Sequence, residues 1–286
     1  MLAGPGGVGK TMFELQVALA VACGGSICGG LFEGAEADVM LSTQPGRVVM
    51  VVAEETVEVI WHRLHAVVAT LHRQHDLLGV DVDPPTLLSL WEKNLRIYPL
   101  AGMPRVTLMH RDLLPTERFT QLLAASEEAR LVMLDPIRRL HASDENDSGS
   151  MTALVQMLQE ITSCTNAALI FAHHTNRAST QLGTGDTAGA ARGSTALSDG
   201  VRWQLNLSRP TRNVAGRYAT ANTDSSRFVM ADIAKSNYLP PQPTVFLERI
   251  AGGVLMRADK VSQFANASTN KQRPRKHKSK VEGIPA

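Results

Sequence analysis

The sequence contains no long uninterrupted apolar run. Among its 286 residues the longest candidate, residues 13–23, is shorter than the roughly 18 to 20 apolar residues that cross a bilayer, and it includes Glu14. The first residues, Met-Leu-Ala-Gly, also lack the basic start and the apolar stretch of a secretory signal. These absences predict a soluble protein in the cytoplasm, with no membrane partner.

Cysteine and aromatic residues are scarce. The 3 cysteines, Cys23, Cys28 and Cys164, form an odd set without a Cys-x-x-Cys pair, which excludes a disulfide scaffold and predicts buried free thiols. Aromatic residues make up only 5% of the chain, which disfavours binding of single-stranded nucleic acid by base stacking. The hydrophobic content of 44% is nevertheless sufficient for one full-sized core.

Positive charge is concentrated near the C-terminus. From Lys271 onward there are six Lys or Arg residues and one Glu, a balance of +5, whereas residues 1–270 carry 23 basic and 26 acidic residues, a balance of −3. The end of the chain has too few apolar residues to bury itself. We therefore expect one folded domain over residues 1–265 and a basic, disordered tail over residues 266–286. The tail either binds polyanions or only keeps the protein in solution.

Short apolar runs alternate with helical stretches over the first two-thirds of the chain. The runs are continuous, as in strands buried on both faces of a parallel sheet, and they span residues 47–53, 131–134 and 167–172. The helical stretches span residues 57–71, 116–129 and 151–162. This alternation predicts an α/β fold with a mostly parallel central sheet flanked by helices.

A phosphate-binding loop lies at the beginning of the chain. Residues 4–11, GPGGVGKT, match the pattern G-x-x-x-x-G-K-[ST] and precede a helical run over residues 12–22. Glycines let the backbone wrap around phosphates with its N–H groups inward, and the helix adds its positive N-terminal end. Lys10 is then expected on the β and γ phosphates of ATP, and the Thr11 hydroxyl on Mg²⁺. The residues expected to bind the nucleotide here are Gly4, Gly6, Gly7, Val8, Gly9, Lys10 and Thr11.

Acidic residues follow two of the predicted strands. Asp135 ends the run LVMLD and is expected to be the second Mg²⁺ ligand. The next residue is Pro136 rather than Glu, so the carboxylate that activates water must come from elsewhere. Glu54, at the end of the strand that follows the phosphate-loop helix, is the favoured general base. Glu55 is the alternative, or it caps the next helix.

Histidines and arginines supply the remaining candidates. His173 and His174 follow the run at residues 167–172, and a histidine can donate to the γ phosphate and report its loss. With Lys10 as the only expected cation, an arginine from a neighbouring subunit is needed to neutralise developing charge. Arg192 and Arg202 are the candidates for this role.

Two polar loops leave the same expected edge of the sheet. Residues 142–150 and 176–193 are rich in Gly, Ser, Thr and Asn, which predicts mobile segments unless a partner binds them. Neither loop has a dense basic stripe. Contact with a DNA backbone would have to come from Arg177, from loop amides and from several subunits together.

The ordered set of motifs resembles the RecA-like hexameric replicative DNA helicases, most closely the RepA-type helicases of broad-host-range IncQ plasmids. Order and spacing agree from about residue 130 to 240, with looser agreement before. The similar stretches are GPGGVGKT at 4–11, AEE at 53–55, HRLHA at 62–66, LVMLDPIRRLH at 131–141, FAHH at 171–174, ARGSTALSDGVRW at 191–203 and AKSNY at 234–238. The resemblance implies a RecA-like P-loop NTPase fold with antiparallel strands towards the C-terminus.

The resemblance also implies roles for residues within one subunit. Lys10 and Thr11 would bind phosphate and Mg²⁺, Glu54 would be the catalytic base, and Asp135 the metal-side carboxylate. His174, with His173 beside it, would sense the γ phosphate.

Further implied roles concern neighbouring subunits and partners. Arg202 would be the finger that reaches into the adjoining subunit, and Lys235 would point towards the same neighbour. The implied activity is ATP-driven 5′ to 3′ unwinding by a six-membered ring around single-stranded DNA, with a plasmid initiator or a primase as a further partner. Two alternatives stay open: a RecA-like regulatory or loader ATPase without unwinding activity, and a nucleotide-gated assembly module.

Two features differ from this family. Only three residues precede Gly4, so we expect the first strand to be almost absent and the N-terminal segment that contacts the next subunit to be truncated. The region between the phosphate-loop helix and Arg47 is longer than usual, and we expect it to form a surface loop.

Overall fold

A single mixed sheet forms the centre of the protein. The computed structural model describes residues 1–31, 44–74, 77–80, 82–175, 195–211 and 224–259, and these contain a nine-stranded sheet of order β3-β2-β4-β5-β1-β6-β7-β8-β9. Neighbouring strands from β3 to β6 in this order are parallel, and those from β6 to β9 are antiparallel. The strands are β1 (Leu2–Gly4), β2 (Arg47–Val52), β3 (Leu95–Pro99), β4 (Ala129–Asp135), β5 (Ala168–His174), β6 (Trp203–Ser208), β7 (Phe228–Ser236), β8 (Val245–Arg249) and β9 (Leu255–Arg257).

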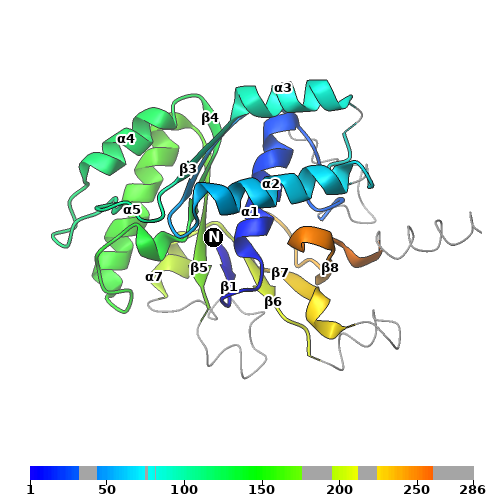
Figure 1. Ribbon diagram of the computed structural model, residues 1–286. Coiled ribbons are helices and arrows are strands. Elements are labelled where there is room, and N and C mark those ends of the chain that lie inside the picture. Colours follow the sequence, from blue (N-terminus) through cyan, green and yellow to red (C-terminus); the bar gives the residue numbers. More distant parts are fainter. Residues whose placement is uncertain (32–43, 75–76, 81, 176–194, 212–223, 260–286) are drawn as a thin grey trace, which may run out of the picture.

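Helices cover both faces of the sheet. Helices α1, α2 and α3 pack on one face, and α4, α5 and α7 pack on the other (Figure 1). Because side chains alternate along a strand, Val48 and Met50 of β2 join the first core while Val49 and Val51 join the second. The helices are α1 (Lys10–Cys23), α2 (Val57–Leu71), α3 (Pro84–Asn94), α4 (Glu117–Ala125), α5 (Ser148–Thr165) and α7 (Ala196–Gly200), with 3₁₀ turns η2 (Ile137–Arg139), η4 (Ser225–Arg227) and η5 (Ala251–Gly253).

Helix α1 is the most deeply buried helix of the first layer. Its sequence is apolar nearly all round, which is typical of a helix enclosed by neighbours. It ends at Gly24, whose φ of 79° is left-handed and whose N–H donates to the carbonyl of Ala20. Within the described part of the chain, no helix combines the length and the apolar character that a membrane span requires.

Strand β1 occupies the middle of the sheet although it has only three residues. Leu2 pairs with Ala172 of β5 on one side and with Leu205 of β6 on the other. The strand takes this central position because it can hydrogen-bond on both edges. The loop that follows β1 therefore emerges at the centre of the sheet.

The observed elements confirm the predicted parallel sheet, the flanking helices and the antiparallel C-terminal strands. The helix expected over residues 116–129 ends at Ala125, because the chain turns there and Ala129 already begins β4. Strand β3 was not predicted, since it lies at the edge of the sheet and alternates between half-buried and exposed residues.

Three further expectations need correction or lie outside the described residues. Cys23 and Cys28 are buried as predicted, but Cys164 on α5 is exposed. The expected surface loop after α1 begins instead with core residues, because Cys28 and Leu31 are buried. The end of the loop expected at residues 142–150 is the first turn of α5. Residues 32–43, 176–194 and 260–286, and with them the second polar loop and the basic tail, lie outside the described residues.

Candidate functional site

The carboxyl ends of four parallel strands bring the predicted residues to one edge of the sheet. Gly4 at the end of β1 is in register with His174 at the end of β5, and Val52 of β2 is in register with Asp135 of β4. Open parallel sheets bind their ligands at this edge. The phosphate loop, the glutamates after β2, Asp135 and His174 therefore lie at one edge of the sheet, as expected from the sequence.

The phosphate loop needs its glycines for two different reasons. Gly7 and Gly9 have φ angles of 70° and 107°, in the left-handed region that favours glycine. Gly4 instead permits a close approach, because a Cβ there would lie 2.7 Å from the carbonyl oxygen of Leu207 and 2.9 Å from Cγ1 of Val8. The loop can thus turn sharply while remaining packed against β6.

Lys10 points back along the loop. Its Nζ donates to the carbonyl oxygens of Gly4 at 2.8 Å and of Pro5 at 3.2 Å, and it lies 3.3 Å from Nδ1 of His174. Burial lowers the pKa of Lys10, and the nearby carboxylates of Asp135, Glu14 and Glu54, taken in that order, act in the opposite direction. The ammonium is therefore a desolvated cation at the centre of the strand-end site.

Thr11 and Asp135 are in direct contact. The Thr11 side chain hydrogen-bonds Asp135, a contact that lowers the pKa of this carboxyl, although burial is the largest effect and raises it. A hydroxyl and a carboxylate are the oxygen ligands that Mg²⁺ prefers in proteins. The two residues predicted to hold the metal are thus brought together, and both have the oxygen donors that it prefers.

Glu14 is a third member of this cluster that sequence reasoning missed. It is completely buried on α1, and burial followed by the charge of Asp135 raises its pKa well above the ordinary value. Its oxygens have no conventional donor, yet the carboxyl lies within hydrogen-bonding reach of Asp135, and two carboxyl groups bond only when one holds a proton. Burial and the neighbouring Asp135 therefore both favour the neutral form of Glu14. The available signal was a single acidic residue inside an apolar helix, one turn after Lys10.

The two candidate bases have different surroundings. Glu55 accepts from Arg63 through both oxygens, from Nε at 2.9 Å and from Nη2. Glu54 is half exposed, and its nearest cationic partner is Nε of Arg139, at 3.9 Å. The carboxylate of Glu54 is therefore accessible, whereas that of Glu55 is held by helix α2.

The two histidines at the end of β5 face opposite sides of the sheet. His174 lies beside Lys10, whereas His173 is buried in the second layer, with Nδ1 at 3.9 Å from Oε1 of Glu145. The same Glu145 oxygen is 3.9 Å from Nε2 of buried His141, whose pKa is lowered to about 4 by burial, then by Arg138 and by His173. Strand alternation explains the split, because neighbouring residues point to opposite faces.

Arg202 and Lys235 lie at the other edge of the sheet. β6 runs parallel to β1 with Leu205 opposite Leu2, so Arg202 immediately before β6 is near the amino end of β1. It precedes Leu207, the residue packed against Gly4, by five positions, or about 16 Å of extended strand. Lys235 donates to the carbonyls of Ser198 at 2.8 Å and Asp199 at 3.0 Å in its own chain. Arg192 and Arg177 are outside the described residues.

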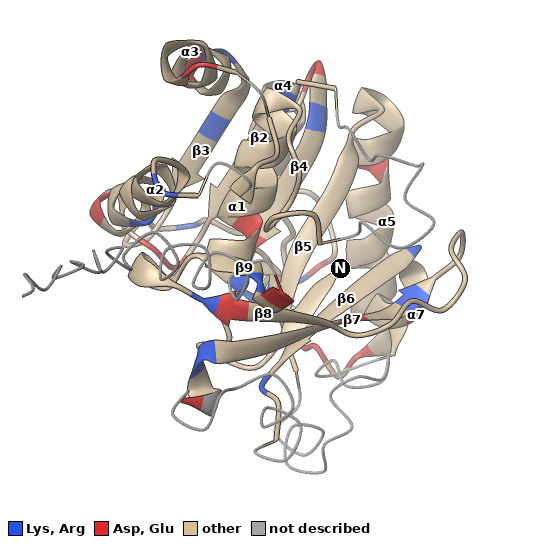
Figure 2. Cartoon of the chain, turned by 90° about the vertical axis from the view of Figure 1, so that its right-hand side faces the viewer, with Lys and Arg blue, Asp and Glu red and all other residues tan. Residues whose placement is uncertain are grey.

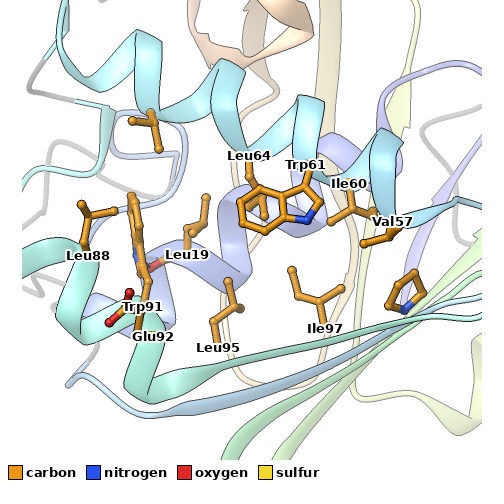
Figure 3. Close-up of a pocket in the computed structure, with 12 residues that line it drawn as sticks. Leu19, Val57, Ile60, Trp61, Leu64, Leu88, Trp91, Glu92, Leu95 and Ile97 are labelled. Atoms are coloured by element: carbon orange, nitrogen blue, oxygen red, sulfur yellow. Dashed lines mark hydrogen bonds between the residues drawn. The ribbon is translucent and has the colours of Figure 1, made fainter.

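A separate apolar pocket lies between α2, α3 and β3. Figure 3 shows Trp61 of α2 and Trp91 of α3 on two sides of this pocket, whose volume is about 340 Å³. Its lining contains one charged residue, Glu92, and no Lys or Arg. This lining therefore offers no cation to a phosphate chain.

Comparisons with known proteins agree with this geometry. The family model for the AAA domain matches residues 1–180. Among solved structures, a DnaB-like replicative helicase, described with its interactions with primase, is similar with a TM-score of 0.56 and 14% identity, over 89% of this chain and 56% of that chain. The RadB recombinase is similar with a TM-score of 0.51 and 14% identity, over 90% of each chain. The present chain thus spans little more than half of the helicase chain, and the likeness confirms the RecA-like fold.

The buried carboxyl of Glu14 generates the first prediction. Because its pKa is raised, the folded protein keeps a proton that the unfolded chain releases above pH 4.5, so this residue makes unfolding easier as pH rises. Glu14→Gln keeps a donor for Asp135 and removes the titration. The free energy of unfolding of the variant should gain up to about 1.4 kcal/mol per pH unit over the unchanged protein above this pH, as measured by chemical denaturation from about pH 5 to 8. Glu58→Gln, at an exposed position, is the control. If the free energy of unfolding of Glu14→Gln changed with pH in the same way as that of the unchanged protein, the raised pKa of Glu14 would be contradicted.

Proposed function

Because the chain belongs to the AAA domain family and has a RecA-like fold, we propose that it hydrolyses ATP at the strand-end site and acts as a replicative DNA helicase of the plasmid or mobile-element type. The observation that carries this proposal is the meeting of Lys10, the Thr11–Asp135 pair and Glu54 at one edge of the sheet. These are the parts that phosphoryl transfer to water requires.

Each residue has a distinct part in the proposed reaction. The loop amides and the Lys10 ammonium bind the β and γ phosphates. Thr11 and Asp135 hold Mg²⁺, which supplies positive charge to the phosphate oxygens when bound. Glu54 orients the attacking water and takes up its proton as the general base. His174, in contact with Lys10, detects the γ phosphate.

The position of Arg202 supports catalysis between subunits. It lies at the edge of the sheet opposite its own phosphate loop, so it can act as a finger only on another copy of the chain. This arrangement supports a homo-oligomer, and we propose a hexamer. Lys235 belongs to the same edge, where it joins β7 to α7.

Similarity to a DnaB-like helicase supports single-stranded DNA as a partner, with a primase or a plasmid initiator as a further one. The similarity to the RadB recombinase over 90% of both chains favours a second candidate, a RecA-like regulatory or loader ATPase that does not unwind DNA. The two candidates share the ATPase site and differ in strand displacement.

Replacement of Glu54 tests the hydrolytic step. Glu54→Gln removes the general base without changing the size of the side chain, so ATP turnover should fall by about 10²- to 10⁴-fold while nucleotide affinity is retained. Steady-state phosphate release and equilibrium binding of a fluorescent nucleotide measure the two quantities. Glu58→Gln, an exposed change on the neighbouring helix, should behave like the unchanged protein. If Glu55→Gln lost turnover to this extent while Glu54→Gln stayed active, Glu55 rather than Glu54 would be the general base.

Replacement of Arg202 tests catalysis at a subunit boundary. Arg202→Ala should lower turnover by about 10³-fold with nucleotide binding intact, because the finger neutralises charge only in the transition state. Mixing Arg202→Ala with Lys10→Ala subunits in equal amounts should restore activity at about one quarter of the boundaries, where an intact loop meets an intact finger. The mixture's phosphate release is the measurement, and a mixture no more active than its components would rule out this arrangement.

Single-stranded DNA distinguishes the two candidate functions. A helicase should show faster ATP turnover with an unstructured oligonucleotide and should displace a strand from a forked duplex. Stimulated turnover without displacement would favour the regulatory ATPase. If no DNA changed the rate of ATP turnover, the proposed helicase function would be contradicted.

A further inference from the structure

Two arginines of the same chain lie against the phosphate loop. Arg249 is the last residue of β8, and its Nη2 donates to the carbonyl oxygens of Gly7, at 3.0 Å, and of Val8. Arg209 follows β6, and a Cβ built on Gly7 would lie 3.6 Å from its Nη2. Figure 2 shows neighbouring acidic and basic bands on β8, where Arg249 ends the strand. The sequence led us to expect Lys10 as the only cation at the loop, and the structure adds these two arginines.

Arg249 controls the orientation of two successive peptides. A phosphate loop turns its N–H groups inward, so the carbonyls of the same peptides must turn outward and find donors of their own. The left-handed conformation of Gly7 and of Gly9 permits this reversal. Arg249 then supplies one guanidinium nitrogen to both outward carbonyls. Its contact with Gly9 is also close, at 3.5 Å from a Cβ built there.

Within the described part of the chain, the two guanidinium groups have no acidic counterpart. Among the described residues, neither Arg209 nor Arg249 forms an ion pair with a carboxylate. The pKa of Arg249 is lowered, first by burial and then by the charge of Arg209. Two neighbouring cations without a counter-ion favour the approach of an anion, and the nearest binding element is the phosphate loop.

We propose that Arg249 is a positioning residue that holds the phosphate loop open for its ligand, and that Arg209 contacts the phosphate chain of the nucleotide from the same subunit as Lys10. This inference rests on the proposed function, since it takes a nucleoside triphosphate as the ligand of the loop. The inference assigns the arginines at the two ends of β6 to different nucleotide sites. Arg202 acts at the site of a neighbouring copy, and Arg209 acts at the site of its own subunit.

The test compares four variants in the full chain. Arg249→Met keeps the length of the side chain but removes its donors, and Arg249→Lys keeps one charged donor group that can still serve both carbonyls. Arg209→Ala removes the second cation. Arg118→Ala, an exposed arginine on α4, is the matched control. Equilibrium binding of fluorescent ADP and of a non-hydrolysable ATP analogue is measured with Mg²⁺ present, together with thermal unfolding without nucleotide.

Loss of donors at the loop should weaken nucleotide binding without unfolding the protein. Arg249→Met should raise the Kd for both nucleotides by about 10- to 100-fold, with Arg249→Lys recovering part of this loss. Arg209→Ala should raise the Kd by about 10-fold and raise KM with little change in kcat, because the contact is made before the transition state as well as in it. Arg118→Ala should match the unchanged protein.

Lys10→Ala separates failure of this inference from failure of the proposed function. If Lys10→Ala abolishes nucleotide binding while Arg249→Met and Arg209→Ala bind as tightly as Arg118→Ala, the two arginines have no part in the site and the inference is overturned. If Lys10→Ala itself binds nucleotide normally, the proposed function fails as well. A lower melting temperature of Arg249→Met with unchanged Kd would show a purely structural arginine and would also overturn the inference.

Discussion

The backbone hydrogen bonds of a three-residue strand hold the phosphate loop at the centre of the sheet. Leu2–Gly4 pairs with β5 on one side and β6 on the other, so the loop begins from a fixed point. Gly4 makes this possible, since any Cβ there would meet the Leu207 carbonyl oxygen at 2.7 Å. Every group of the strand-end site is positioned relative to this strand, directly or through its neighbours in the sheet.

Burial of charge is the second constraint on the site. Lys10, Glu14 and Asp135 occupy one poorly solvated volume behind the loop, where an isolated charge would be strongly disfavoured. The ammonium of Lys10 and the carboxylate of Asp135 stabilise each other, and burial raises the pKa of Glu14, which opposes a third charge in the same volume. The arrangement keeps a cation and an acceptor ready at the strand ends, and the half-exposed Glu54 remains in contact with solvent.

Local patterns made much of the fold predictable. A glycine-rich loop before a helix and an apolar run before Asp135 each act within a few residues, so the sequence identified both. The contacts of Arg249 with Val8 and Gly7 join residues 241 and 242 positions apart, and only the antiparallel order of β6, β7 and β8 brings them together. The sequence alone also could not tell which of His173 and His174 faces Lys10. The answer depends on the direction of each side chain on β5, and this depends on the core that each face of the strand contacts.

Strand β6 joins the two edges of the molecule with six residues, Trp203–Ser208, and an arginine flanks each end. The strand is paired on both sides, with β1 and with β7. In the proposed assembly, this strand is the covalent link between an arginine directed at a neighbouring copy and an arginine that lies against its own phosphate loop.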